Sequence, residues 1–499
     1  MTESPKVLIV GAGMGGLTLG LLLERIGVDF EIFERASCVK PLGAAMSIGP
    51  NILPMFEQIG MLDEIMKMSL PGKAMELYSE DVGGLTLIGR TDNAAFVKEK
   101  SGYSSIMFSR PDLHKLLLSK ISPNRIHFNK RVLSVGQSDK GVLLRCADGS
   151  IYEGDILIGA DGAYSAVRQS MYERLQKENL LPKCDTVSLS AGYACMVGTT
   201  VPQDPEKYPI LKDDYSHLFV VVAEGKPHSW TVITIPGNRF CFGVVIQLGD
   251  KEKDETFRNS EWGPELIDSM IAQVADHKVP FGTLGDLIQA TPRELISKVY
   301  LEEKLFETWN HDRIALIGDA CHKMLPSAGQ GAINAMQDAV ILANCIYELR
   351  SPSHKQIVAA LKDYKSQRYD HAKKQVQISS TVGKVFYGQT WYEKLMRKAV
   401  FTWMPMSFEE RNFFKLAGYR PQVAFLPFVE NKTNLKILPQ KKSKRKYGLA
   451  VDPRITAASM SLDFRDSVID TNPENVRIVF GYIVKESQIQ QSWRLVAWN

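Results

Sequence analysis

Three glycines and an acid near the start of the chain have the types and spacing of a dinucleotide-binding site. Gly11, Gly13 and Gly16 follow a short apolar run in a G-x-G-x-x-G pattern, and Glu34 lies 18 residues after Gly16. In such a site the first glycine permits a tight turn, the second lets a pyrophosphate approach the backbone, and the third lets a helix pack on a strand. The acid would bond ribose hydroxyls. We therefore expect this segment to bind a dinucleotide; the alternative is a glycine-rich turn without a ligand.

A second group of such residues lies about 300 positions further along the chain. Asp319 follows the apolar run 314–317, at the carboxyl end of a predicted strand, where open α/β sheets bind ligands. Pro326 and the sequence Gly329-Gln330-Gly331 then predict a loop that a cofactor can approach closely. A helix is expected from about Ala332, with its N-terminus aimed at the same ligand. An ordinary strand–loop–helix connection is the alternative.

A third motif lies between these two. The predicted buried strand 156–158 runs into Asp161 and Gly162, and Ser165 and Arg168 follow at the start of a helix. An aspartate and a glycine after a strand are also common in plain turns, so this motif alone leaves a structural role equally open.

The elements that must position these motifs predict an α/β fold in several parts. Residues 185–290 differ from the rest, because strand-like apolar runs alternate there with turn residues, including a predicted hairpin at 236–239. We expect a Rossmann-like domain interleaved with an antiparallel β-sheet substrate domain and followed by a helical C-terminal extension. The expected ranges are 1–180 for the first part of the dinucleotide domain, with a substrate-domain insertion near 70–110, 181–290 for the β-rich domain, 291–390 for the second part, 391–430 for the helical extension and 431–499 for a basic, partly disordered tail.

Composition excludes several classes of protein. With 499 residues, 44% of them hydrophobic, the chain can form two or three globular domains. The net charge is +4, and the basic cluster at 441–446 accounts for this positive charge. The rest of the chain is therefore nearly neutral, and we do not expect a nucleic-acid partner. The seven cysteines are scattered and form no C-x-x-C pair, so we predict neither a disulfide framework nor a metal site.

The chain shows no leader-like N-terminus and no run of about 18 apolar residues. We therefore expect a cytoplasmic protein without a membrane span. The segment 391–418 alternates aromatic and basic residues, which leaves open peripheral contact with an intracellular membrane, although packing against the body is favoured. The basic cluster is interpreted as a solvated run, with an anionic-lipid or nuclear-import patch as the alternative. The oligomeric state is left open.

Together the three motifs resemble those of single-component FAD-dependent monooxygenases of the para-hydroxybenzoate hydroxylase type. The order and spacing match from about residue 5 to 390. The runs "MFSRPDLHKLL", "AGYACMVG" and "AGYRPQVAFLPFVE" are similar to fungal members that epoxidise prenylated and terpenoid substrates. The resemblance implies FAD contacts at Gly11, Gly13, Gly16, Glu34, Arg35, Ala45, Arg110, Asp161, Gly162, Arg168, Asp319, Pro326, Gly329, Gly331 and Ala332.

The resemblance also implies the chemistry. NAD(P)H would reduce FAD, O₂ would add at flavin C4a, and one oxygen atom would pass from the resulting hydroperoxide to a small apolar substrate. Tyr193 is a candidate catalytic residue and Trp230 a candidate pocket residue, although aromatic residues in strands are more often part of the core. Cys321 and His322 are expected to have structural roles. A reductase or halogenase of the same fold is the alternative, as is an inactive flavin-bound scaffold whose basic tail binds a partner.

Overall fold

The computed structural model describes residues 4–38, 45–92, 94–248, 264–403 and 413–445. A six-stranded sheet forms the first layer, in the order β19-β20-β11-β1-β2-β7, and all its strands except β19 run parallel. Their bounds are β1 Lys6–Val10, β2 Asp29–Phe33, β7 Ile126–His127, β11 Ile156–Gly159, β19 Asn310–His311 and β20 Ile314–Leu316. Parallel strands need covered faces, and their sequences are accordingly almost continuously apolar.

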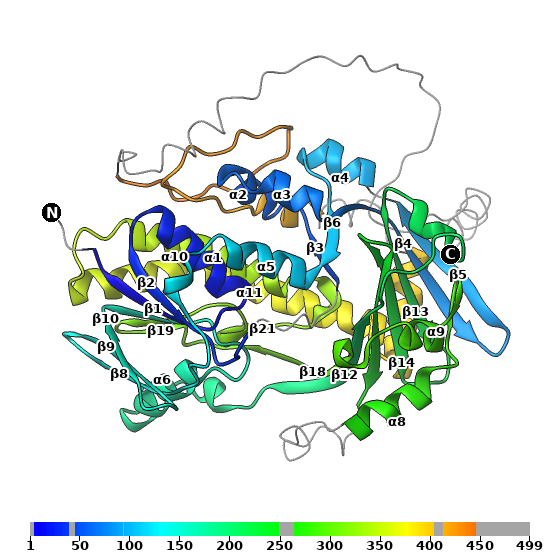
Figure 1. Ribbon diagram of the computed structural model, residues 1–499, viewed down its shortest axis with the longest axis horizontal. Coiled ribbons are helices and arrows are strands. Elements are labelled where there is room, and N and C mark those ends of the chain that lie inside the picture. The colour runs from blue at the N-terminus through cyan, green and yellow to red at the C-terminus, as the bar shows by residue number, and fades with distance from the viewer. Residues whose placement is uncertain (1–3, 39–44, 93, 249–263, 404–412, 446–499) are drawn as a thin grey trace, which may run out of the picture.

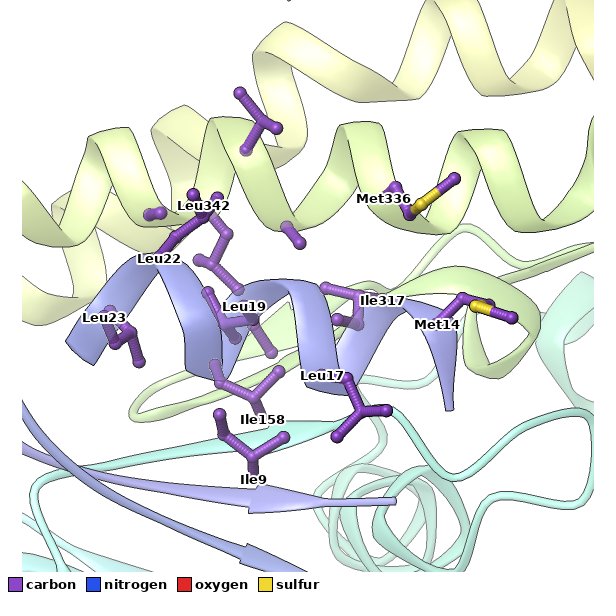
Figure 2. Close-up of a cluster of buried hydrophobic side chains, with 14 of the residues drawn as sticks. Ile9, Met14, Leu17, Leu19, Leu22, Leu23, Ile158, Ile317, Met336 and Leu342 are labelled. Carbon is purple, nitrogen blue, oxygen red and sulfur yellow. The ribbon is translucent and has the colours of Figure 1, made fainter. Parts of the chain in front are cut away.

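Helices cover one face of this sheet in two layers (Figure 1). Helix α1 (Met14–Arg25) lies between the strands that carry Ile9 and Ile158 and helix α10 (Gly331–Tyr347), as Figure 2 shows. Small residues allow this close approach, because a Cβ on Gly15 would lie only 3.2 Å from the carbonyl oxygen of Ala335. The 34-residue helix α11 (His354–Tyr387) packs on α10. Helix α6 (Ala166–Lys177) lies on the opposite face, where its Val167 is next to Gly159 of β11 (Figure 1). The remaining helices before residue 120 are α2 Leu53–Gln58, α3 Leu62–Lys67, α4 Ala94–Ser101 and α5 Arg110–Ser119.

A ten-stranded sheet forms the second part of the molecule, on the right in Figure 1. Its order is β21-β18-β12-β15-β14-β13-β4-β6-β3, with β5 paired to β4. The strands are β3 Ala45–Ile48, β4 Leu70–Asp81, β5 Gly84–Asp92, β6 Ile106–Ser109, β12 Ser190–Thr199, β13 Ser216–Ala223, β14 His228–Ile235, β15 Arg239–Gln247, β18 Ser297–Leu305 and β21 His322–Lys323. The strands from 70 to 110 thus join those from 190 to 305 in one sheet.

The sequence predicted an antiparallel sheet here, and one strand pair differs. β13 runs parallel to β4, because the chain leaves β4 for the six-stranded sheet and returns only at residue 216. The predicted hairpin is confirmed: β14 and β15 pair in antiparallel register around Gly237 and Asn238, which both have positive φ. Helices α8 (Pro264–Val274) and α9 (Leu284–Gln289) cover one face of the sheet.

Two small sheets complete the β-structure of the described residues. One has the order β10-β9-β8, formed by β8 Val132–Ser138, β9 Gly141–Cys146 and β10 Ile151–Gly154. The other pairs β16 Lys278–Val279 with β17 Gly282–Thr283.

The C-terminal part differs from the predicted helical extension over 391–430 and the predicted basic, partly disordered tail over 431–499. Helix α12 (Trp391–Trp403) and the helical residues 413–418 agree with the prediction, but residues 419–445 form a non-helical strap. Gln58 holds this strap by accepting a hydrogen bond from Val423 N and donating one to Val423 O, both at 2.8 Å. Leu435 is buried against residues of α4, so the strap is fixed by packing as well. Residues 446–499, the rest of the predicted tail, lie outside the described residues.

In the described part of the chain, no helix combines the length and the hydropathy that crossing a bilayer requires.

Candidate active site

The three sequence motifs meet at one edge of the six-stranded sheet. β1, β11 and β20 are neighbours, with Val10 paired to Gly159 and Gly159 paired to Leu316. The carboxyl ends of these parallel strands therefore lie side by side. The turns that follow them carry Gly11, Asp161 and Asp319, so residues separated by about 300 positions form one site.

The first turn is shaped for a ligand that approaches the backbone. Gly11 has a φ of +104°, and a Cβ on it would lie 2.4 Å from the carbonyl oxygen of Ala160. A Cβ on Gly16 would lie 2.1 Å from the carbonyl oxygen of Gly11, so α1 could not begin this close to β1 with any other residue. A Cβ on Gly13, in contrast, would meet no atom within 4 Å. Gly13 also caps α1 without a side-chain hydrogen bond, which leaves the N–H groups of the first turn free for an anion.

Glu34 lies beside this turn. Its two carboxylate oxygens accept hydrogen bonds from the backbone N–H groups of Ala12 and Ala36, both at 2.9 Å. Each carboxylate oxygen can accept a further bond, so the backbone fixes the side chain and leaves it able to bind ribose hydroxyls. Arg35 is exposed next to it, and Arg110 is exposed at the first position of α5.

The loop after β11 carries Asp161, whose side chain is bound by a backbone N–H group a few residues further along the chain. Asp161 Oδ2 accepts a hydrogen bond from Val167 N at 3.2 Å, and burial raises the pKa of this carboxyl group. Asp161 Oδ1 is buried without a hydrogen-bond partner among the described residues. Gly162 follows it in a left-handed conformation, and a Cβ there would meet no atom within 4 Å. This loop thus offers both a polar group and space to a ligand.

Arg168 links two loops of the site. Its guanidinium donates to the carbonyl oxygens of Ala320 at 2.8 Å and Ala163 at 2.6 Å, and it lies 4.1 Å from the centre of the Phe306 ring. These contacts join the Asp161 loop to the loop that carries Asp319. The structure therefore gives Arg168 a positioning role within the protein.

The second half of the site follows β20. Asp319 lies in a short 3₁₀ turn and is paired with Lys323 at 2.5 Å. Pro326 begins another 3₁₀ turn, Gly329 ends it with a φ of +63°, and α10 starts at Gly331. This agrees with the predicted helix start near Ala332.

The sequence did not indicate the residues that fix this loop. Asn51 is buried, and its side-chain Nδ2 donates a hydrogen bond to Gln330 Oε1 at 3.0 Å. Its backbone carbonyl oxygen accepts a hydrogen bond from Gln337 Nε2, also at 3.0 Å. The segment after β3 is thereby tied to the start of α10. Ala45, at the start of β3, donates its N–H to Cys241 Sγ at 2.9 Å, which ties the same segment to β15.

A network of buried hydrogen bonds lies next to Asp319, around the side chain of Asp338. Asp338 accepts hydrogen bonds from Gly318 N at 2.8 Å, His322 Nε2 at 2.5 Å and Arg368 Nε at 2.7 Å. Although burial alone would raise the pKa of Asp338, His322 and Arg368 hold it below its ordinary value. The predicted structural role of His322 is therefore confirmed. The four-residue spacing of Asn334 and Asp338 was a signal for this network, since both bind Arg368.

Cys321 Sγ lies within 4.8 Å of ligand atoms of His322 and Asp338, which raises the question of a metal site. Arg368 already pairs with Asp338, and burial raises the pKa of the Cys321 thiol well above its ordinary value. A protonated thiol beside a neutralised carboxylate suits packing rather than metal binding. Cys321 is fully buried, as the sequence predicted.

One face of the ten-stranded sheet turns toward this site. Leu325, next to Pro326, packs in one cluster with Tyr193, Cys195 and Val245 of the sheet. Further along the same face, two rows of paired residues cross strands β4, β13, β14, β15 and β12. Six half-buried side chains lie in these rows, and one of them is Thr199 at the end of β12. We call the other five the apolar sheet face: Met75, Val197, Leu218, Thr231 and Ile233.

The apolar sheet face carries one polar group, the Thr231 hydroxyl. None of its five side chains is a carboxylate, imidazole or ammonium group. Tyr193 borders it as a buried residue, with its ring edge-on to Tyr387 at 5.5 Å, and burial raises the pKa of its hydroxyl. Trp230, the other aromatic candidate, is excluded from this face. It points to the opposite side of β14, where its Nε1 donates to Lys278 O at 3.0 Å.

Comparison with known proteins agrees with this geometry. The model of a family described as FAD binding domain matches residues 4–205 and 211–379. The FAD-dependent monooxygenase ptmM of Penicillium ochrochloron is 31% identical over 388 residues, covering 73% of this chain and 84% of its own. The FAD-dependent monooxygenase atmM of Aspergillus flavus is 29% identical over 387 residues, covering 75% of this chain and 77% of its own.

Solved structures share the fold. HpxO of Klebsiella pneumoniae, complexed with FAD and uric acid, superposes with a TM-score of 0.65 at 23% identity, covering 83% of this chain and 96% of its own. 2,6-Dihydroxypyridine-3-hydroxylase from Arthrobacter nicotinovorans gives a TM-score of 0.61 at 18% identity, covering 78% of this chain and 95% of its own.

Proposed function

Because this chain belongs to the FAD-dependent monooxygenases of the para-hydroxybenzoate hydroxylase type, we propose that it transfers one oxygen atom of O₂ to a carbon–carbon double bond of an apolar, prenylated or terpenoid substrate. The second oxygen atom would leave as water, with NAD(P)H as the electron donor. The observation that supports an apolar substrate is the apolar sheet face beside the loop 326–331.

The residues at the sheet edge fit FAD. Open space above Gly13 and Gly162 and the uncapped N-terminus of α1 suit a pyrophosphate, and Glu34 suits a ribose. The start of α10 also lacks a side-chain cap and an acidic residue in its first turn. Asp319 and the loop from Pro326 to Gly331 would then hold the flavin half. Bound there, FAD would supply electron transfer and activation of oxygen, chemistry that cofactors rather than amino-acid side chains carry.

The chain's own residues would orient the substrate and exclude water. Met75, Leu218 and Ile233 can bind hydrocarbon, and burial of such surface contributes about 25 cal/mol per Å². Hydroxylation of a phenol is assisted by a base that removes its proton, whereas epoxidation of an alkene requires none. The apolar sheet face offers no such base among its five side chains, which favours an alkene. Tyr193 stays a proposed catalytic residue at the border of this face.

Uptake of O₂ by the FAD-loaded protein tests the proposal. NADPH and NADH are supplied in turn, with a prenylated aromatic compound, its saturated analogue and a simple phenol as substrates. We expect the unsaturated compound to accelerate O₂ uptake and to yield one product molecule per nicotinamide oxidised. Acceleration by the phenol alone would contradict the assignment to alkenes, and turnover without O₂ uptake would favour a reductase.

A further inference from the structure

Helix α12 (Trp391–Trp403) is oriented with two charged side chains, Glu393 and Arg397, inward and with large apolar side chains outward. Glu393 and Arg397 are only 3% and 5% exposed, whereas Trp391, Leu395 and Tyr392 are 78%, 56% and 50% exposed. At 3.6 residues per turn, the two buried residues lie on one edge of the helix and the three exposed ones lie on the other side. A surface helix of a soluble protein normally has the reverse arrangement.

Hydrogen bonds of the buried edge fix this orientation. Arg397 donates through Nε to Val385 O at 2.8 Å, and through Nη2 to Gly388 O. Glu393 accepts from the backbone N–H of Thr390 at 3.1 Å and from its hydroxyl at 2.6 Å. Rolling the helix over to bury Trp391 would remove these partners, at the cost of unpaired buried groups.

The turn before the helix is built for this arrangement as well. A Cβ on Gly388 would lie 2.4 Å from Cδ of Glu393, so only glycine lets the glutamate lie against the turn. The contact between Gly388 and Glu393 thus helps to fix the orientation of α12, which places its apolar side chains outward.

The exposed side of α12 combines aromatic residues with positive charge. Lys398 is exposed and Lys394 is half-buried, and both flank the apolar side chains, while Lys384 is exposed near the end of α11. The one acidic residue within 391–398 is the buried Glu393. Tryptophan and tyrosine favour the boundary between headgroups and acyl chains, and lysines beside them attract anionic lipids.

We propose that α12 is a docking surface for an anionic phospholipid membrane, lying in the plane of the interface with Trp391, Tyr392 and Leu395 inserted. Insertion of an amphipathic helix depends on both its apolar area and its basic residues, and α12 presents both on one side. Pairing α12 with α12 of a second copy would cover the apolar side chains but would bring lysines together, because Glu393, the acidic residue of 391–398, is buried. This proposal does not depend on the reaction that the protein catalyses.

Flotation of the full-length, FAD-loaded protein with vesicles tests it. One vesicle set contains phosphatidylcholine with about one-third phosphatidylserine and the other contains phosphatidylcholine alone. We expect binding to the anionic set, weakened when salt rises from about 0.1 M to about 0.5 M. The variant Trp391→Ser/Leu395→Ser should bind at least about ten-fold more weakly, and so should Lys394→Glu/Lys398→Glu.

The control variant is Leu133→Ser/Leu180→Ser, because these leucines are 60% and 61% exposed elsewhere on the molecule. It should bind like the unmodified protein, and all variants should keep their FAD absorbance and unfolding temperature. Equal binding of the Trp391→Ser/Leu395→Ser variant would overturn the proposal. Vesicle binding that appears only after removal of residues 446–499 would also overturn it. The same holds if the unmodified protein does not bind vesicles but sediments as a dimer, and the Trp391→Ser/Leu395→Ser variant sediments as a monomer.

Discussion

Arg368 Nε lies 2.7 Å from Asp338 Oδ1, and neither side chain is accessible to solvent. Asp338 also accepts hydrogen bonds from His322 and from the backbone N–H of Gly318, the residue before Asp319. Helix α11, which carries Arg368, is thereby connected to the loop that would hold the flavin half of FAD. The pair has consequences for both stability and cofactor binding.

Replacing Arg368 with methionine should lower the free energy of unfolding by about 3–5 kcal/mol, because the charge of Asp338 would then be buried without its partner. FAD should also bind more weakly, since Asp338 orients the Gly318 N–H. Urea unfolding and flavin titration measure the two effects. Arg350→Met, at an exposed position, is the control and should change stability by less than about 0.5 kcal/mol. Unchanged stability of Arg368→Met would show that the pair is dispensable.

Gly13 and Gly16 should respond differently to alanine. A Cβ at Gly13 enters open space, so Gly13→Ala should fold normally but bind FAD at least about ten-fold more weakly, because the methyl group occupies room for the pyrophosphate. A Cβ at Gly16 would clash with the Gly11 carbonyl oxygen, so Gly16→Ala should lose thermal stability as well. Thermal unfolding of the FAD-free proteins separates the two cases. Equal unfolding temperatures for the two variants would contradict this assignment.

Stability should fall in mildly acidic solution because of a buried histidine pair. His228 Nδ1 lies 2.8 Å from His277 Nε2, and His277 Nδ1 bonds Glu80 at 2.5 Å. Burial, together with His277 and Lys226, lowers the pKa of His228 from 6.5 to about 4. Above pH 6.5 both the folded and unfolded states are neutral at this site, so stability is complete. Between about pH 6.5 and 4 the unfolded state binds the proton first, and stability declines.

His228→Asn should remove part of this decline, by roughly 2 to 3 kcal/mol at most. The free energy of unfolding, measured from pH 4 to 7, reports the effect. Leu180→Ser is the control, because this position is 61% exposed and carries no titratable group, and its pH profile should match that of the unmodified protein. A parallel shift of the whole His228→Asn profile would point to lost packing rather than to titration.

Substrate binding should depend on the apolar sheet face. Ile233→Asn places a polar amide among apolar side chains, so KM for an apolar substrate should rise about ten-fold while FAD binding stays unchanged. Ile151→Asn, at a position that is 54% exposed on β10, serves as the control. Steady-state kinetics and flavin titration of both variants give the comparison. An unaltered KM for Ile233→Asn would place the substrate elsewhere.

Local sequence was sufficient for the parts of the site that depend on turns. Gly11, Gly16 and Gly329 lie where tight geometry requires glycine, and the strands before them are short, apolar and buried. Their meeting at one sheet edge follows because parallel strands align their carboxyl ends. The turns were predictable from spacing, whereas the joining of all three motifs in one FAD site was an implication of the family resemblance.

Features that depend on which face packs inward were not predictable. Residue 230 could point to either side of its strand, and pairing register decides between them; Trp230 points away from the site. Helix periodicity likewise separates the two sides of α12 without saying which is buried. Arg368 lies 30 residues from Asp338 in the sequence, so no local pattern connects them. The strap 419–445 is held by side chains such as Gln58, which are equally remote.

The most direct test of the central claim is mass spectrometry of the product formed from an unsaturated apolar substrate under ¹⁸O₂, with the FAD-loaded protein and a nicotinamide donor. Transfer of one oxygen atom from O₂ to the double bond predicts one ¹⁸O atom in each product molecule. When the label is supplied as H₂¹⁸O instead, none should be present. Product without ¹⁸O from labelled O₂ would contradict the assignment as an oxygen-inserting enzyme.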